Sequence, residues 1–123
     1  MNPNAPKPPS EQGPDVSAAI RRILDNKNDQ IEGTFCHALF EDRFFDDALL
    51  SRLIDDMELV LGQDEVSPVH REVIHWVVLS TARCFFSHFN ADDLYKIKNF
   101  DAALYSRWCD DHFERLRNLM MAR

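Results

Sequence analysis

The stretch from residue 67 to residue 90, SPVHREVIHWVVLSTARCFFSHFN, constrains the fold of this chain more than any other. Ser67 can cap a helix by accepting a backbone N–H, and Pro68 fits the first helical position, where a missing donor costs nothing. Apolar residues then lie on most sides of the helix, which is typical of a helix surrounded by other elements. The longest unbroken apolar run, residues 76–79, is too short to span a membrane. We therefore predict a central hydrophobic helix over about residues 68–89 in an all-α, single-domain bundle of four to five helices.

Two other stretches have the apolar spacing of amphipathic helices. One covers about residues 15–27 and the other about residues 47–61. Asp46 is placed to cap the second helix and Gly62 to end it. The apolar face of this helix is broad and its opposite face is acidic, so we expect it to be buried on one side and solvated on the other.

The segment 30–40 is less regular because Gly33 interrupts it, and an interior glycine costs about 1 kcal/mol relative to alanine. Either the helix begins after this glycine or a partner packs closely against it. A strand over residues 34–40 is the alternative. In the connection that follows, Phe44 and Phe45 are expected to fill the core, and either one would be an anchor for a partner if it were exposed.

The C-terminal part predicts a connector and one last helix. Residues 90–99 are polar, with room for one helical turn, and Asp101 is placed to cap a helix that reaches about residue 121. The expected buried stripe of this helix consists of Ala102, Tyr105, Trp108, Cys109, Phe113, Leu116 and Met120.

The chain divides into a tail and one domain. Residues 1–14, MNPNAPKPPSEQGP, hold five of the six prolines, and such a segment cannot bury enough apolar surface to offset its ordering entropy. We predict a disordered, proline-rich tail over residues 1–14 and a helical domain over residues 15–123. A chain of 123 residues is long enough for one domain with a substantial core.

No pattern predicts catalysis or a metal site. His70 and His75 are five residues apart, so they point about 140° apart on a helix and cannot share a metal ion. Cys84 and His88 could share a helical face, but two phenylalanines follow the cysteine, and burial makes a thiol less reactive. The three glycines are too few to build a phosphate-binding loop. We therefore expect no enzyme, no cofactor and no metal.

The three cysteines, Cys36, Cys84 and Cys109, are widely spaced and lie among apolar residues. They indicate free buried thiols in a reducing compartment. No charged-then-apolar leader opens the chain, so we expect a cytoplasmic protein that does not associate with membranes.

The net charge of −7 is concentrated in one segment. Nine acids and only two bases lie between Glu41 and Glu65, so this segment carries the whole surplus and the rest of the chain is balanced. An acidic chain does not suit nucleic-acid binding, which needs a basic face, but a surplus of one sign steers association with an oppositely charged partner. We predict that a docking surface is formed by Asp42, Asp46, Asp47, Asp55, Asp56, Glu58, Asp64 and Glu65.

A short, acidic, all-helical chain without an active site resembles the immunity proteins of bacterial polymorphic-toxin systems, including contact-dependent growth inhibition. The phrases IEGTF at residues 31–35 and DLYKIKN at residues 93–99 are similar to one helical immunity family. The resemblance would cover about residues 15–121. It implies a tight one-to-one complex between a monomer and its cognate toxin, usually a nuclease, whose active site is occluded.

We therefore expect an immunity protein that neutralises a basic toxin, such as a ribonuclease, through the acidic surface. The alternative is a small acidic adaptor or secretion chaperone, which would bind a partner segment in an apolar groove and dimerise. A small enzyme with a pocket lined by His70, Arg71, His75 or Cys84 ranks below both.

Overall fold

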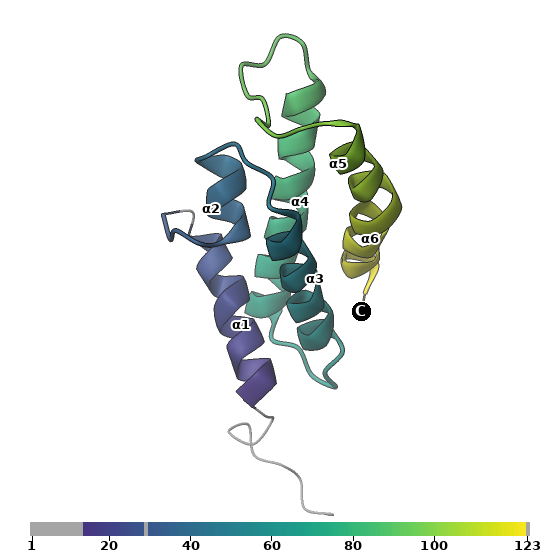
Figure 1. Ribbon diagram of the computed structural model, residues 1–123. Helices are drawn as coiled ribbons and strands as arrows, with labels where there is room; N and C mark the ends of the chain where they lie inside the picture. Colours follow the sequence, from purple (N-terminus) through teal and green to yellow (C-terminus); the bar gives the residue numbers. More distant parts are fainter. Residues whose placement is uncertain (1–13, 29, 123) are drawn as a thin grey trace, which may run out of the picture.

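The computed structural model describes residues 14–28 and 30–122, and within these ranges all of the regular structure is helical. The predicted all-α bundle is therefore confirmed. The predicted tail lies outside the described residues, apart from Pro14. The helices in chain order are α1 (Pro14–Lys27), α2 (Phe35–Phe40), α3 (Asp47–Leu61), α4 (Pro68–Phe89), α5 (Ala102–Arg107), the π-helical turn η2 (Trp108–His112) and α6 (Phe113–Met121). The long helix α4 packs against α1, α2 and α6, as expected of a central helix (Figure 1).

Side-chain caps begin three helices where the sequence predicts them. Ser67 accepts a hydrogen bond from the N–H of Val69 at the start of α4. Asp46 and Asp101 accept backbone N–H groups three residues on, at the starts of α3 and α5. Each cap satisfies a donor that the first helical turn leaves free.

The short helix α2 begins after Gly33, so the strand alternative for residues 34–40 is wrong. Thr34 caps α2 by accepting the N–H of His37 at 3.1 Å. Gly33 has a φ of 86°, a left-handed conformation that glycine adopts at little cost. This turn separates α2 from α1.

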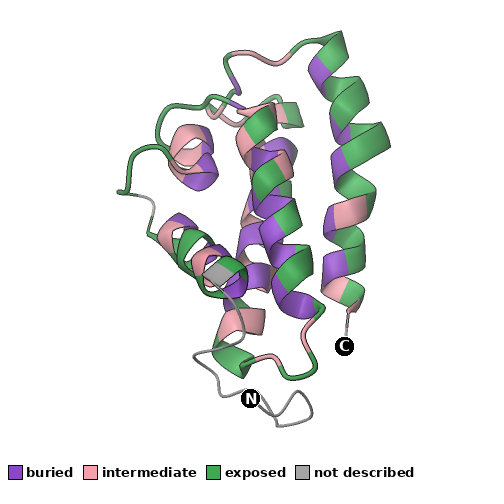
Figure 2. Ribbon diagram, turned by 60° about the horizontal axis from the view of Figure 1, so that its bottom comes forward, coloured by how far each residue is buried: buried purple, intermediate pink, exposed green. Residues whose placement is uncertain are grey.

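The prediction that α4 is covered on most sides is wrong. One broad face is buried, through Val73, Ile74, Val77, Val78, Thr81 and Phe85. Several apolar side chains elsewhere on the helix are exposed: Val69, Leu79, Phe86 and Phe89. Figure 2 shows this division between buried and exposed surface along the helices. The helix α4 therefore carries more apolar side chains than the core of a single chain buries.

The helices α5 and α6 are joined without a break, but the predicted buried stripe is partly wrong. Ala102, Tyr105, Cys109 and Phe113 are exposed, whereas Leu104, Trp108, His112, Leu116 and Leu119 are buried.

The π-turn explains the shift of this stripe. The N–H of Phe113 donates to the carbonyl oxygen of Trp108, five residues back. Twelve residues of regular α-helix rotate about 120° beyond three full turns. The extra residue in η2 removes about 100° of that rotation, so Leu104, Trp108, His112 and Leu116 stay on one face.

Phe45 lies at the centre of an aromatic core. Its ring makes edge-to-face contacts with Phe35, Phe85 and Trp108, at centroid distances of 5.6, 5.4 and 6.4 Å. Phe85 in turn stacks on Trp108 at 3.9 Å. The neighbouring Phe44 is exposed, so one of the two predicted core phenylalanines is buried.

Two loops that are distant in sequence are joined above α3. The side-chain amide of Asn99 accepts the N–H of Phe45 at 2.9 Å and donates to the carbonyl of the same residue at 2.8 Å. The N–H of Lys98 donates to the carbonyl of Arg43 at 2.7 Å. Residues 90–99 form a connector without a helix. Its first turn closes where the N–H of Asp93 donates to the carbonyl of Asn90, and the side chain of Asn90 accepts the N–H of Asp92.

Candidate protein-binding surfaces

The eight predicted carboxylates lie on α3 and on the loops at its two ends. Asp42 and Asp46 precede the helix, whereas Asp64 and Glu65 follow it. The other four lie within the helix: Asp47, Asp55, Asp56 and Glu58. The structure thus brings them into one region, but their partners differ.

Asp56 belongs to the interface between α1 and α3. Its two carboxylate oxygens accept the Nε and Nη2 hydrogens of Arg22, each at 2.8 Å. The Asp56 side chain is only 12% exposed, whereas that of Arg22 is 57% exposed. Hydrogen bonding to Asp56 raises the pKa of Arg22. This bidentate pair satisfies the carboxylate inside the fold.

Asp47 joins α3 to the C-terminal helices. Arg107 Nη2 donates to Asp47 Oδ2 at 2.5 Å, and His112 Nε2 lies 2.5 Å from Asp47 Oδ1. The hydrogen bond from Arg107 lowers the pKa of Asp47, burial opposes this shift, and the contact with His112 supports it. Asp47 is therefore a structural contact between α3 and the last helices.

Asp55 and Glu58 share one cation. Arg115 Nη2 donates to Asp55 at 2.7 Å, and the same guanidinium also binds Glu58. The pKa of Arg115 is raised, chiefly by its hydrogen bond with Glu58. Two carboxylates against one guanidinium leave one negative charge on this exposed part of α3.

The remaining carboxylates are at the two ends of α3. Asp46 is occupied as the helix cap. Asp42 is exposed and lies 3.8 Å from the imidazole of His37. Asp64 and Glu65 are exposed and form no salt bridge with any described residue. Three arginines that are distant in sequence thus bind four of the eight carboxylates and leave one negative charge in the middle of the acidic region.

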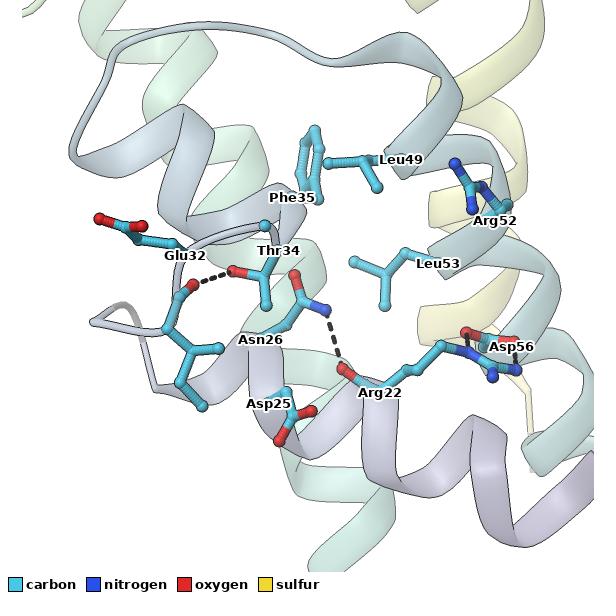
Figure 3. A pocket seen from close by; sticks show the side chains of 12 residues that line it. Arg22, Asp25, Asn26, Glu32, Thr34, Phe35, Leu49, Arg52, Leu53 and Asp56 are labelled. Atoms are coloured by element: carbon cyan, nitrogen blue, oxygen red, sulfur yellow. Dashed lines mark hydrogen bonds and ion pairs between the residues drawn. The ribbon is translucent and has the colours of Figure 1, made fainter.

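A pocket of about 250 Å³ lies between α1, the turn before α2 and α3 (Figure 3). Asn26 is fixed within it, because its amide donates to the carbonyl of Arg22 and accepts the N–H of Cys36. Glu32 and Arg52 lie on opposite sides of the pocket (Figure 3). Asn26 thus joins α1 to α2, and the polar side chains labelled in Figure 3 do not converge on one point where a substrate atom could react.

The possible nucleophile pair is not arranged for catalysis. His88 Nδ1 accepts the backbone N–H of Ile97 at 2.9 Å, so this nitrogen is not available as a base. Burial raises the pKa of the Cys84 thiol, which disfavours the reactive thiolate. Within residues 14–28 and 30–122, no group of three or more His, Cys, Asp or Glu side chains is arranged to hold a metal ion.

A second exposed surface lies on α4 and on the neighbouring C-terminal helices. We call it the α4/α6 face, and it consists of Leu79, Ala82, Phe86, Phe89, Tyr105, Cys109 and Phe113. Its aromatic side chains are between 47% and 74% exposed. Aromatic residues are enriched at protein–protein interfaces, so exposure of four of them marks this surface as a second candidate.

None of the helices in the described part of the chain combines the length and the apolar character needed to cross a membrane. Comparisons of the chain with protein-family models, with curated proteins and with solved structures found no match. The two exposed surfaces, the acidic region of α3 and the α4/α6 face, are therefore the candidate binding sites of this protein.

Proposed function

We propose that this chain is an immunity-type inhibitor, which binds a basic toxin of the nuclease class, one chain to one toxin, through the carboxylates along α3. The observation that supports this proposal is the exposure of Asp42, Asp64 and Glu65. No described arginine or lysine forms a salt bridge with these three side chains. They are available to pair with the lysines and arginines that a nuclease uses to bind phosphate.

The two acidic ends of α3 can contact one partner together. A helix of 15 residues is about 22 Å long, and a standard interface of about 800 Å² per partner is about 28 Å across. The pair of carboxylates bound by Arg115 lies between the two ends and keeps one negative charge. The proposed surface is therefore Asp42, Asp55, Glu58, Asp64 and Glu65, while Asp46, Asp47 and Asp56 support the fold.

The test uses the product of the neighbouring reading frame as the partner. Asp42→Asn, Asp64→Asn and Glu65→Gln are combined in one variant, and association rate and nuclease activity are measured over a range of salt concentrations. We expect the association rate at low salt to fall about tenfold, with a weaker dependence on salt.

The matched control carries Glu72→Gln, Asp92→Asn and Asp110→Asn, which remove the same charge from exposed positions outside α3 and the loops at its two ends. It should associate nearly as fast as the wild type. If both variants slow association equally, or if wild-type association does not depend on salt, electrostatic capture by α3 is wrong.

The α4/α6 face favours a second candidate, an adaptor or secretion chaperone that binds an apolar segment of a partner. This class requires the face to be free in the unbound protein. It predicts that an amphipathic peptide binds at the face and that Phe86→Glu abolishes binding, which isothermal titration calorimetry would measure.

A further inference from the structure

The α4/α6 face is formed by two helical stripes that run side by side. On α4 the residues Leu79, Ala82, Phe86 and Phe89 recur at intervals of three and four, so they share one side of the helix. The rings of Phe89 and Tyr105 meet at a centroid distance of 5.8 Å and join this stripe to the last helices. Beneath them, Phe85 stacks on Trp108, so the face rests on the aromatic core.

The area of this face matches what a stable dimer needs. Its four aromatic residues and Leu79 expose on the order of 500 Å². A standard interface buries about 800 Å² on each partner, and about 65% of a homodimer interface is apolar. The exposed apolar area is thus close to what one subunit contributes. It also lies at the upper end of the range for apolar patches on monomeric proteins.

The face combines projecting and small side chains. Phe86 is 74% exposed and projects from α4. Ala82 on the same helix and Cys109 on η2 are small and exposed, so the surface is lower where they lie. A surface that carries both kinds of feature can pack against a second copy of itself, because a two-fold axis repeats each contact, so that a projection of one copy that fits a low position of the other does so twice.

The charges around the face permit two copies of an acidic chain to approach. The exposed charged residues within one or two helical turns of the face are Glu72, Arg83, Asp101, Arg107, Asp110, Asp111, Glu114 and Arg117. These are five acids and three bases, a surplus of two negative charges, whereas nine acids and two bases lie between residues 41 and 65. Like charges opposed across an interface are unfavourable, so self-association meets less repulsion at this face than along α3.

The segment before α1, MNPNAPKPPSEQG, contains no aromatic or branched aliphatic residue that could supply apolar cover for this face. We propose that the α4/α6 face binds the same face of a second copy, which makes the protein a symmetric homodimer. This differs from the monomer expected from the family resemblance, and it leaves both ends of α3 free for a toxin on each subunit.

Sedimentation equilibrium of the full chain tests the dimer directly. At about 100 μM the wild type should have twice the chain mass of 14.3 kDa, because interfaces of standard size have dissociation constants of about 1 μM or tighter. Phe86→Glu should sediment as a monomer. Leu94→Glu is the matched control, since it places the same charge on an exposed apolar residue outside the face, and it should stay a dimer.

Thiol labelling provides a second measurement that does not depend on whether a variant loses stability. Cys36 is buried, Cys84 is half-buried and Cys109 is exposed. Labelling of Cys109, located by mass spectrometry, should slow about tenfold as the wild-type concentration rises from well below to well above the dissociation constant. In Phe86→Glu the labelling rate should not depend on concentration.

Three results would overturn the homodimer at this face. One is a monomeric wild type at about 100 μM, and a monomer that binds an amphipathic peptide at the face would favour the adaptor. Another is a dimer that Phe86→Glu leaves intact, which would place the interface elsewhere. The third is that both Phe86→Glu and Leu94→Glu are monomers, which would show that a charge added outside the face also disrupts the dimer. Failure of toxin binding with an intact dimer would count against the proposed function alone.

Discussion

The buried imidazole of His112 lies against α3, with its Nε2 2.5 Å from Oδ1 of Asp47. The other carboxylate oxygen of Asp47 accepts a hydrogen bond from Arg107. The second ring nitrogen of His112, Nδ1, has no hydrogen-bond partner among the described residues. Asp47 is thus the group that satisfies this buried histidine, and it joins α3 to the last helices.

We expect Asp47→Asn to lower the free energy of unfolding by about 1–3 kcal/mol at pH 7, because it weakens the contact to the buried His112 as well as the contact to the exposed Arg107. The pKa of Asp47 is lower in the folded protein. Its stabilisation is therefore present above the unfolded pKa and is lost as the pH falls through the folded pKa. The difference between wild type and variant should narrow below about pH 4.

Urea denaturation at a series of pH values measures this difference. Asp64→Asn is the control, because Asp64 is exposed and forms no salt bridge with a described residue. Its effect should stay within about 0.5 kcal/mol. An Asp47→Asn variant as stable as the control at pH 7 would contradict the structural role of the contact.

Replacing Arg22 and replacing Asp56 should lower the stability of the protein by different amounts. Arg22→Met leaves a carboxylate that is 12% exposed without its cation, and we expect a loss of about 2–4 kcal/mol. Asp56→Asn leaves an arginine that water can solvate, so we expect a loss of about 1 kcal/mol. A double-mutant cycle in urea measures the coupling. Equal losses for the two single variants would contradict the predicted asymmetry, and a coupling energy near zero would mean that Asp56 does not depend on Arg22.

Substitution of Phe44 and of Phe45 should have very different effects on stability, although the two residues are adjacent. Phe45 is 1% exposed and Phe44 is 44% exposed. We expect Phe45→Leu to cost about 2–3 kcal/mol, because it removes three aromatic contacts and leaves a cavity. Phe44→Leu should cost less than about 0.5 kcal/mol. Thermal unfolding followed by circular dichroism measures both, and similar melting temperatures for the two variants would place Phe45 outside the core.

Gly33 should tolerate asparagine better than alanine. A Cβ atom at this position meets no heavy atom within 4 Å, so any cost comes from the φ of 86° alone. We expect Gly33→Ala to lose about 1 kcal/mol of stability, and Gly33→Asn to lose less because asparagine adopts left-handed backbone more readily. Chemical denaturation of both variants measures the difference. A neutral alanine variant would mean that the turn changes shape.

Local features of the fold were predictable from the sequence because their causes are local. Ser67, Asp46 and Asp101 each precede an apolar helical pattern, and each caps a helix in the structure. The π-turn was not predictable in this way. It depends on how Trp108 and His112 pack against other helices, and no local signal marks it. The buried stripe of the last helix was therefore partly wrong.

The acidic region shows why the charge of a surface cannot be predicted from the composition of one segment. Arg22, Arg107 and Arg115 lie at least 34 residues from the carboxylates that they bind. One signal was present, because Asp47 and Asp55 are eight residues apart and so are Arg107 and Arg115. Matched spacing of this kind suits two helices that run parallel.

The sequence also could not predict which apolar residues of α4 are exposed. Leu79 and Phe86 are as apolar as Val77 and Phe85, yet the first two are exposed and the last two buried. The hydrophobicity of a side chain predicts that it is buried in the functional state of the protein. It does not predict whether the residues that bury it belong to the same chain or to another one.

The side chain of Asn99 takes both backbone hydrogen-bonding groups of Phe45, as a neighbouring β-strand would. The loop that carries Asp42 and Asp46 is thereby tied to a loop more than fifty residues further along the chain. A partner that binds the upper end of α3 would meet carboxylates that are already ordered, so little conformational entropy would remain to be lost on binding. Preorganisation of the contact region would then come in large part from the side-chain amide of Asn99, on a loop far from it in the sequence.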